Sequence, residues 1–245
     1  MAARVSTDAS GTVAETAARL HALANPDDAL FLQGYFKTGP GEYAEGDRFL
    51  GVRVPALRTL VRDLDGVPPE GLLGLLRSPW HEERLLALLA LVRRYPRADP
   101  ATQDALHRLY LAHTAHVNNW DLVDASAPTL VGAHLDRTGQ WHQLDALTSS
   151  PSLWERRIAM VATFHFIRKG VYVPTLHVAG LLLLDPHDLI HKAVGWMLRE
   201  VGKRDREAAE GFLRAHQRSM PRTALRYAIE RFPPDLRRRY LDGTA

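Results

Sequence analysis

The sequence predicts an all-α fold, and three observations support that prediction. Apolar residues recur at spacings of three and four in residues 100–111, 153–167 and 188–202, which is the period of an amphipathic helix. At three places a capping residue stands directly before a proline, a pattern typical of a helix start. No segment alternates apolar and polar residues long enough for a half-buried strand, because the β-rich run at 171–173 ends at Pro174.

The predicted helices follow in chain order. Helix starts are expected at the cap–proline pairs Asn25-Pro26, Ser78-Pro79 and Asp99-Pro100. A further helix is expected over residues 119–135. Pro128 has no N–H to donate to the carbonyl of residue 124, so it is expected to bend this helix.

Residues 153–168 are apolar nearly all round, which predicts a central, buried helix. Arg156 and Arg157 interrupt this apolar run. Because a buried arginine needs an anionic partner, one of the two is expected to open onto a binding face and meet phosphate.

The helices come in pairs, with a full unit of roughly 35 to 45 residues, which is the length of HEAT-type repeats. No sequence consensus recurs, so the units are expected to share their helical structure rather than a residue pattern. Such units stack into a curved α-solenoid with a concave binding face. Because no long linker divides the chain, residues 11–245 are expected to form a single HEAT-like repeat domain. The small, polar stretch at 1–10 is expected to be disordered.

The composition excludes several classes of protein. The 245 residues are 46% hydrophobic and 24% charged, which is ordinary for a globular chain with a buried core. There are no cysteines, so disulfides, thiolate zinc sites and cysteine nucleophiles are excluded. No apolar run approaches the roughly 18 residues that a membrane span needs, so no membrane partner is expected.

Positive charge is concentrated near the C-terminal end. The whole chain carries a net charge of +3, whereas residues 191–240 carry +7 and residues 1–190 carry −3. A basic end on a nearly neutral chain favours a polyanionic partner such as nucleic acid. The alternative interpretation is a solvated, arginine-rich surface.

Residues 188–203 place a tryptophan among cations. One side of this helical wheel is apolar, and the opposite side carries Lys192, Trp196, Arg199 and Lys203. A tryptophan usually belongs to a core. The periodicity here instead predicts an exposed indole that stacks on a sugar or base while the three cations hold phosphates.

A second tryptophan is paired with a carboxylate. Trp120 and Asp124 are four residues apart, and the wheel puts both away from the broad apolar face of the 119–135 helix. An aromatic plane and a carboxylate therefore project together. The alternative is structural, with Asp124 capping or pairing with a neighbouring helix and Trp120 serving as a packing residue.

A carboxylate on a surface that faces DNA repels phosphate and weakens binding, so its presence there indicates a functional role. Cleavage of a glycosidic bond builds positive charge on the deoxyribose. A carboxylate can stabilise that charge and orient the attacking water, and indole faces add cation–π stabilisation. A base that is already cationic through alkylation at N3 or N7 leaves as a neutral molecule and needs no general acid.

Other candidate sites are weaker. The glycine-rich stretch at 39–47 lacks the spacing of a phosphate-binding motif and is interpreted as a connection between helices. His81 and Glu82 lack the second histidine of a metalloprotease motif. His187 and His191 have a spacing that could hold a metal, although we expect neither a metal nor an organic cofactor.

Five stretches together resemble the AlkD-like family of DNA alkylation repair glycosylases. They are FLGVRVP at 49–55, NNWDLVD at 118–124, SAP at 126–128, LWERR at 153–157 and IHKAVGWMLR at 190–199. The similarity runs from about residue 31 to residue 240. These motifs are long and ungapped, so the match is far more specific than any single tryptophan–aspartate pair.

The resemblance implies a HEAT-like solenoid that wraps duplex DNA and works without a cofactor. The implied activity is that of a monofunctional alkylpurine DNA glycosylase, a hydrolase that releases cationic N3- and N7-alkylated purines. Unlike most glycosylases, the family does not flip the base into a pocket. A monomer in a bacterial-type cytoplasm, associated with the nucleoid when bound to DNA, is expected.

The resemblance also implies roles for individual residues. Trp120 and Trp196 would flank the deoxyribose of the lesion, and Asp124 would stabilise the sugar cation and position water. Arg157 matches the family arginine that contacts the DNA backbone near the lesion.

Two alternatives stay open. A non-catalytic DNA-binding HEAT-like solenoid would bind DNA with steep salt dependence and release no base. A protein-interaction solenoid would have little affinity for DNA at physiological salt. Release of an alkylated base distinguishes a glycosylase from both.

Overall fold

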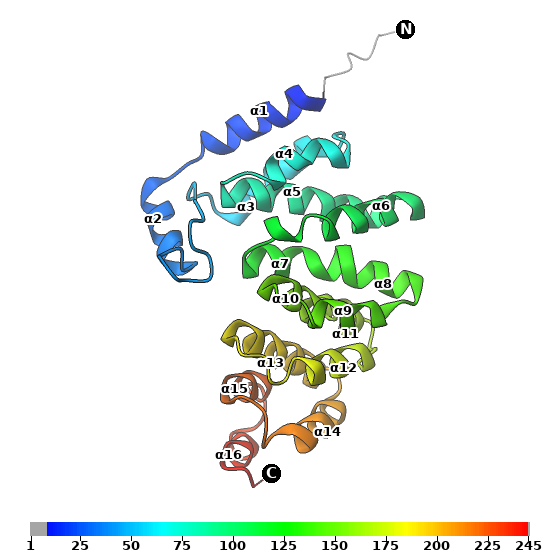
Figure 1. Cartoon of the computed structure of the whole chain (residues 1–245). Helices are drawn as coiled ribbons and strands as arrows, with labels where there is room; N and C mark the ends of the chain where they lie inside the picture. The colour runs from blue at the N-terminus through cyan, green and yellow to red at the C-terminus, as the bar shows by residue number, and fades with distance from the viewer. Residues whose placement is uncertain (1–8, 245) are drawn as a thin grey trace. The chain divides into compact units, whose positions relative to one another are not determined.

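The computed structural model describes residues 9–244, and every regular element in that range is helical (Figure 1). The same residues contain no β-strand, only an isolated bridge between Arg48 and Trp80. The predicted all-α, helical-repeat fold is confirmed. None of the described helices combines the length and the hydropathy needed to cross a membrane.

The chain divides into two compact units, residues 1–126 and 127–245. The division falls near the end of helix α7 (Trp120–Ala127). The single domain over 11–245 stays a prediction. Of the stretch 1–10, for which the sequence predicts disorder, residues 1–8 lie outside the described residues, while Ala9 and Ser10 begin helix α1.

The first unit is built around helix α5, which packs against α3, α4 and the first 3-10 turn. Its α-helices are α1 (Ala9–His21), α2 (Pro26–Tyr35), α3 (Val54–Leu60), α4 (Leu73–Leu76), α5 (His81–Arg94), α6 (Pro100–Leu111) and α7. Its 3-10 turns are η1 (Val61–Leu64), η2 (Pro69–Leu72), η3 (Tyr95–Arg97) and η4 (Thr114–His116). Four of the five leucines of α5, all except Leu89, are buried, so this helix forms the core of the unit.

Two of the three predicted helix starts are confirmed. The side chain of Asn25 accepts hydrogen bonds from the backbone N–H groups of Asp27 and Asp28 and caps α2. The carboxylate of Asp99 accepts from the N–H of Thr102 and caps α6. Both starts are therefore fixed by local chemistry that the sequence displays.

The third predicted start, at Ser78-Pro79, is wrong, because helix α5 begins at His81. The Ser78 hydroxyl accepts from the N–H of Trp80 in a turn, and the N–H of His81 donates to the carbonyl of Arg48 at 2.8 Å. A contact with a distant loop therefore keeps this segment extended for two more residues.

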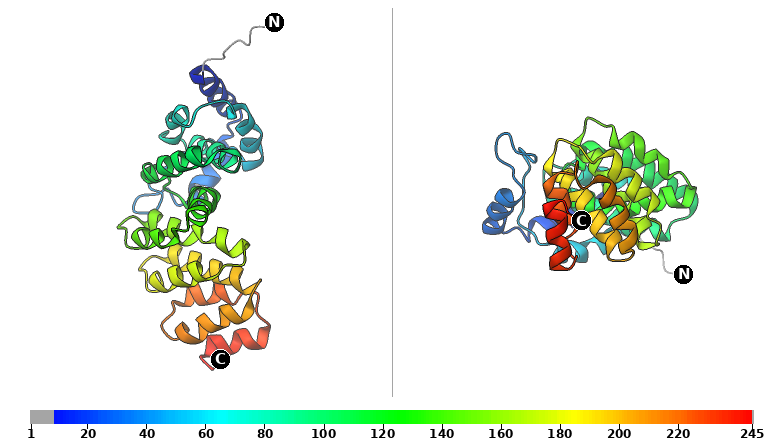
Figure 2. Two further views of the ribbon diagram at one scale, coloured as in Figure 1. Left: turned by 90° about the vertical axis from the view of Figure 1, so that its right-hand side faces the viewer. Right: turned by 90° about the horizontal axis from the view of Figure 1, so that it is seen from below.

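The second unit repeats a pair of helices. Its elements are η5 (Pro128–Gly132), α8 (Ala133–Thr138), η6 (Trp141–Gln143), α9 (Leu144–Thr148), α10 (Leu153–Ala162), α11 (Phe164–Arg168), α12 (Val173–Leu181), α13 (Asp188–Gly202), α14 (Arg206–His216), α15 (Arg222–Ala228) and α16 (Pro234–Asp242). Helix α13 packs against both α10 and α15, and these layers can be followed in Figure 2. The starts of α10, α13 and α15 are 35 and 34 residues apart, which agrees with a HEAT-type repeat.

A glycine sets the distance between α13 and α15. A Cβ atom at Gly195 would lie 2.4 Å from the carbonyl oxygen of Ala224, closer than any side chain allows. Glycine is therefore required in the middle of the IHKAVGWMLR stretch. Because Trp196 is the next residue, this contact also fixes where its indole leaves the helix.

The helix type changes at Pro128. The residues Pro128–Gly132 form a π-helical segment between α7 and α8. Because Pro128 has no N–H to donate to the carbonyl of Asp124, the regular α-helical pattern cannot continue through this turn.

The prediction of one helix over 153–168 is wrong. Helix α10 ends at Ala162 and α11 begins at Phe164. Between them, both the N–H and the hydroxyl of Thr163 donate to the carbonyl of Met160, the hydroxyl at 2.7 Å. This local bonding replaces the i−4 pattern and separates the two helices.

Candidate functional site

Helix α7 carries the predicted tryptophan–aspartate pair. Trp120 and Asp124 are half-buried, one turn apart, whereas Leu122 and Val123 between them are fully buried. The pair thus lies at the margin of the core, where a side chain is both held by its neighbours and partly open to solvent.

The indole of Trp120 belongs to an aromatic column. Its ring stacks on Phe36 with centroids 5.0 Å apart, and Phe36 stacks on Phe49, also at 5.0 Å. Phe49 in turn stacks on the imidazole of His81 at 4.4 Å. Tyr35 meets the indole edge-on at 6.0 Å. Trp120 therefore contacts two adjacent rings at the end of α2, and Phe36 links it to Phe49 and His81.

The imidazole at the end of this column is a buried cation. His81 is 2% exposed, and its Nδ1 and Nε2 atoms lie 3.0 Å from Asp47 and 2.8 Å from Asp121. Burial alone would lower the pKa of His81, but the charges and hydrogen bonds of the two carboxylates outweigh it and raise the pKa to about 9. Because Asp121 follows Trp120 directly, the His81 imidazolium fixes the first turn of α7.

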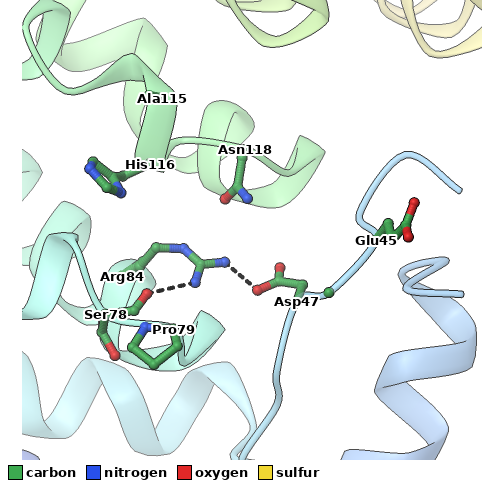
Figure 3. Close-up of a pocket in the computed structure, with 9 residues that line it drawn as sticks. Glu45, Asp47, Ser78, Pro79, Arg84, Ala115, His116 and Asn118 are labelled. Carbon is green, nitrogen blue, oxygen red and sulfur yellow. Dashed lines mark hydrogen bonds and ion pairs between the residues drawn. The ribbon is translucent and has the colours of Figure 1, made fainter. Parts of the chain in front are cut away.

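Arg84 completes this buried network, and Figure 3 shows its contacts with Asp47 and Ser78. Its guanidinium donates to the carboxylate of Asp47 and to the carbonyl of Ser78. Burial would raise the pKa of Asp47, but His81 and Arg84 together lower it below its usual value. The network of His81, Arg84, Asp47 and Asp121 therefore pairs two cations with two carboxylates.

Glu82 clamps the backbone that carries Phe49. Its buried carboxylate accepts hydrogen bonds from the N–H groups of Leu50, Gly51 and Val52 at 2.8–3.1 Å. Gly51 has a φ of +82°, and a Cβ there would lie 2.1 Å from the carbonyl oxygen of Asn25, so only glycine fits. The FLGVRVP stretch is thus a backbone clamp that holds the aromatic column.

The carboxylate of Asp124 lies close enough to Tyr110 to affect it. Tyr110 is fully buried, and burial raises the pKa of its hydroxyl; the hydrogen bond from Ser126 opposes this rise and the charge of Asp124 adds to it. The single proton of the Ser126 hydroxyl lies between two acceptors, the Tyr110 oxygen at 3.0 Å and the Leu122 carbonyl at 2.6 Å. The charge of Asp124 therefore acts on a buried tyrosine that contacts its own helix through Ser126.

The second predicted tryptophan lies in the second unit and has a different setting. Trp196 on α13 is half-buried, and its nearest aromatic neighbour, Phe164, lies 5.8 Å away at an interplanar angle of 49°. The guanidinium of Arg168 lies over the Phe164 ring at 4.2 Å. The indole thus borders an aromatic–cationic surface.

Each of the three cations predicted around Trp196 has a carboxylate neighbour. Lys192 pairs with Asp188 at 2.8 Å, Arg199 pairs with Glu230, and Lys203 pairs with Glu200 at 2.5 Å. Burial opposes ionisation of Glu200, but Lys203 and Arg204 lower its pKa. The cationic strip is therefore largely neutralised within the unit. Two of the three carboxylates lie on α13 itself, and only Glu230 comes from another segment.

Neither arginine of the LWERR stretch is exposed. Arg157 is 5% exposed, and its Nη1 donates to the carbonyl of Leu189 at 2.8 Å. Arg156 binds Asp185 through its Nε at 2.6 Å and also donates to the carbonyl of Ser150. Arg156 therefore ties the start of α10 to the loop before α13, and Arg157 ties it to the first turn of α13.

Sequence reasoning missed several cations that are open to solvent. Arg226 on α15 and Arg238 on α16 are exposed, and neither has an ion-pair partner within residues 9–244. The concentration of positive charge at 191–240 was the available signal for them.

The two histidines whose spacing could hold a metal, His187 and His191, take part in hydrogen bonds within the protein. The Nδ1 atom of His187 accepts from the N–H of Leu189 and caps α13, and the Nε2 of His191 contacts the carbonyl of Asp185. The 39–47 stretch joins α2 to α3. Within it, Glu42 and Glu45 accept hydrogen bonds from glycine N–H groups.

The predicted residues thus fall into two groups. Trp120 and Asp124 belong to the first unit, together with the unpredicted Phe36, Phe49 and His81. All the predicted DNA-contacting residues and Trp196 belong to the second unit.

Comparison with known proteins completes this description. Among solved structures, a predicted DNA alkylation repair enzyme from Enterococcus faecalis is similar, with a TM-score of 0.68 and 17% identity over 86% of this chain and 97% of that chain. At this identity the likeness shows the fold alone. No curated protein matches. Residues 16–232 match the family described as DNA alkylation repair enzyme. The chain therefore belongs to the DNA alkylation repair enzyme family.

Proposed function

We propose that this protein is a monofunctional DNA glycosylase that hydrolyses the N-glycosidic bond of cationic N3- and N7-alkylated purines in duplex DNA. Its family assigns it to DNA alkylation repair. The observation that carries the proposal is the pair on α7, in which a half-buried carboxylate lies one turn from an indole held in an aromatic column.

Asp124 is the catalytic carboxylate in this proposal. The bond between C1′ of the deoxyribose and the base nitrogen breaks, and its electron pair neutralises the cationic base, which leaves without protonation. Positive charge develops on the sugar and is stabilised by the Asp124 carboxylate. Water attacks C1′ and passes its proton to Asp124 and then to solvent.

The two indoles act on the same sugar cation. Trp120 offers a π face whose position the aromatic column fixes, and a cation–π contact stabilises developing charge. Trp196 is assigned to the same deoxyribose by family resemblance. Because catalysis takes place at the sugar, the base does not have to be flipped into a pocket.

The remaining predicted residues grip the DNA backbone. Lys192, Arg199 and Lys203 exchange their carboxylate partners for phosphates. Family resemblance assigns Arg157 to the backbone near the lesion, although this side chain is buried and bound to the carbonyl of Leu189 in the free protein. The exchange is inexpensive for the exposed Lys192–Asp188 pair, because surface ion pairs contribute only about 0–1 kcal/mol. In this proposal the carboxylates keep the strip neutral until DNA is bound.

The decisive experiment measures release of 7-methylguanine and 3-methyladenine from methylated duplex DNA, with chromatographic detection. We expect Asp124→Asn to lose roughly 10²- to 10³-fold in rate, the usual effect of removing one electrostatic stabiliser. Asp235→Asn, an exposed change of the same charge on α16, should keep the wild-type rate.

The alternatives predict other outcomes. Equal rates for Asp124→Asn and wild type would refute the assigned mechanism. Salt-dependent DNA binding without base release would favour a non-catalytic DNA-binding solenoid, and negligible DNA affinity would favour a protein-interaction solenoid.

A further inference from the structure

A cluster of two histidines and one aspartate lies in the second unit, on other helices than those that carry Trp196 and its cations. His142 lies in η6, Asp145 in α9 and His177 in α12. One ligand atom from each residue lies within 4.8 Å of the other two, and no other group of this kind occurs in residues 9–244. Three donors from separate elements thus converge at one point.

The donor set and spacing suit a transition metal. Two imidazole nitrogens and a carboxylate oxygen are typical ligands of Zn²⁺ and its neighbours in the periodic table. With metal–ligand bonds of about 2.0–2.1 Å, ligand atoms lie about 3 Å apart. The Nε2 atom of His177 and the Oδ1 atom of Asp145 are already 2.8 Å apart. A proton shared by this pair can be replaced by a metal ion without moving either side chain far.

The third ligand can complete the site by a small movement. The ligand atoms lie within 4.8 Å of one another, whereas those around a bound ion lie about 3 Å apart. Because His142 is exposed, its imidazole can move by the remaining distance of roughly an ångström or two. Trp141 packs against His142 with ring centroids 3.5 Å apart and meets His177 edge-on at 5.3 Å. The indole therefore lies against both imidazoles.

We propose that His142, Asp145 and His177 bind one divalent transition-metal ion of the Zn²⁺ class. The three protein ligands leave at least one coordination position for water. The bound ion links η6 and α9 to α12 and so stabilises the second unit. This proposal departs from the expectation, drawn from the sequence, that the protein binds no metal.

The experiment titrates Zn²⁺ into the full chain, free of any affinity tag, by calorimetry. We expect one ion per chain in the wild type. His177→Ala should weaken binding by at least about tenfold, since even the loss of a residue that only orients a ligand costs that much. His191→Ala is the matched control and should bind as the wild type does, because His191 is engaged with the Asp185 carbonyl. Equal affinities in the wild type and His177→Ala would overturn the proposal.

Asp145→Asn keeps the shape of the side chain and serves as a second variant. It should also weaken Zn²⁺ binding, and Zn²⁺ should raise the Tm of the wild type but of neither ligand variant. A Tm increase of the same size in all three proteins would contradict the assigned ligands.

Trp141 offers an independent readout of position. Ni²⁺ or Cu²⁺ should quench tryptophan fluorescence in the wild type, and Trp141→Phe should lose most of this quenching while it still binds Zn²⁺. Undiminished quenching in Trp141→Phe would place the ion elsewhere and overturn the assignment.

Discussion

Helices α7 and α13 each carry a half-buried tryptophan, but the two helices are held in different ways. In the first unit, Trp120 stacks in a column of rings that ends on the imidazolium of His81. In the second unit, Trp196 has one aromatic neighbour among residues 9–244, Phe164 at 5.8 Å, and partly exposed ion pairs lie on its helix.

The two kinds of ion pair, buried in the first unit and more exposed in the second, suit different functions. A buried network of paired charges holds its members in one geometry, because any displacement leaves a charge unpaired in a poorly solvated place. Exposed pairs cost little to exchange, so they suit a surface that changes partners. The first unit is therefore built to position a side chain, and the second to present cations that can be released.

The largest expected effect breaks the network of the first unit. His81→Ala leaves Asp47 and Asp121 without their shared cation and should lower the free energy of unfolding by about 3–5 kcal/mol, the usual cost of removing one partner of a buried pair. The measurement is urea or guanidinium unfolding followed by circular dichroism.

The control is a histidine–aspartate pair in the second unit. His165 lies 3.0 Å from Asp136, and both side chains are about one quarter exposed. His165→Ala should therefore cost at most about 1 kcal/mol. If both variants lost the same free energy of unfolding, the buried charges of the first unit would hold the fold no more firmly than the exposed pairs of the second.

A pH titration tests the same network without a mutation. The pKa of His81 is raised from 6.5 to about 9 in the folded protein, so the protonated form is favoured by folding. This contribution is fully present below pH 6.5 and declines as the pH rises towards 9. The free energy of unfolding of the wild type should decrease through this window.

His116 contributes to stability outside that window. Burial, with His113 and Arg77 nearby, lowers the pKa of His116, so its contribution is present above pH 6.5 and is lost as the pH falls. His81→Ala should therefore show a flatter profile between pH 6.5 and 9 than the wild type. An unchanged decline in the variant would assign the effect to another group.

The sequence predicts best the elements whose signals are local. Residues 100–111 and 188–202 were expected from their apolar period, and the structure has helices with these bounds. Caps at Asn25 and Asp99 act within three residues, so they are visible in the sequence. Periodicity predicted that Trp196 stacks on a sugar or base, whereas family resemblance supplied the alkylated purine as the substrate.

What the sequence could not predict depends on contacts between distant segments. His81 binds residues 34 and 40 positions away, and the start of α5 is delayed by the carbonyl of Arg48. Glu230, the partner of Arg199, lies 31 positions away, so the helical wheel of residues 188–203 does not show it. Glu200, the partner of Lys203, lies on that wheel three positions away and could have been identified from the sequence. The stretch at 80–84, WHEER, was considered in the sequence only as a metal-binding motif. In the structure, His81 and Arg84 belong to the buried network, and Glu82 forms the backbone clamp.

The smallest expected effect tests the exchangeable cations of the second unit. Glu230→Gln removes the partner of Arg199 and leaves its guanidinium available for phosphate. DNA binding should tighten, and the slope of log K against log salt should steepen by about 0.9, the increment for one further phosphate contact.

The matched control is Glu207→Gln on α14, which removes the same charge from an exposed residue that has no ion pair in residues 9–244. Fluorescence anisotropy with an undamaged duplex at several salt concentrations gives both slopes. A steeper slope in Glu230→Gln alone means that a specific cation has been released. Equal changes in the two variants would mean that only net charge matters, and the ion pairs on α13 would then have no part in controlling DNA affinity.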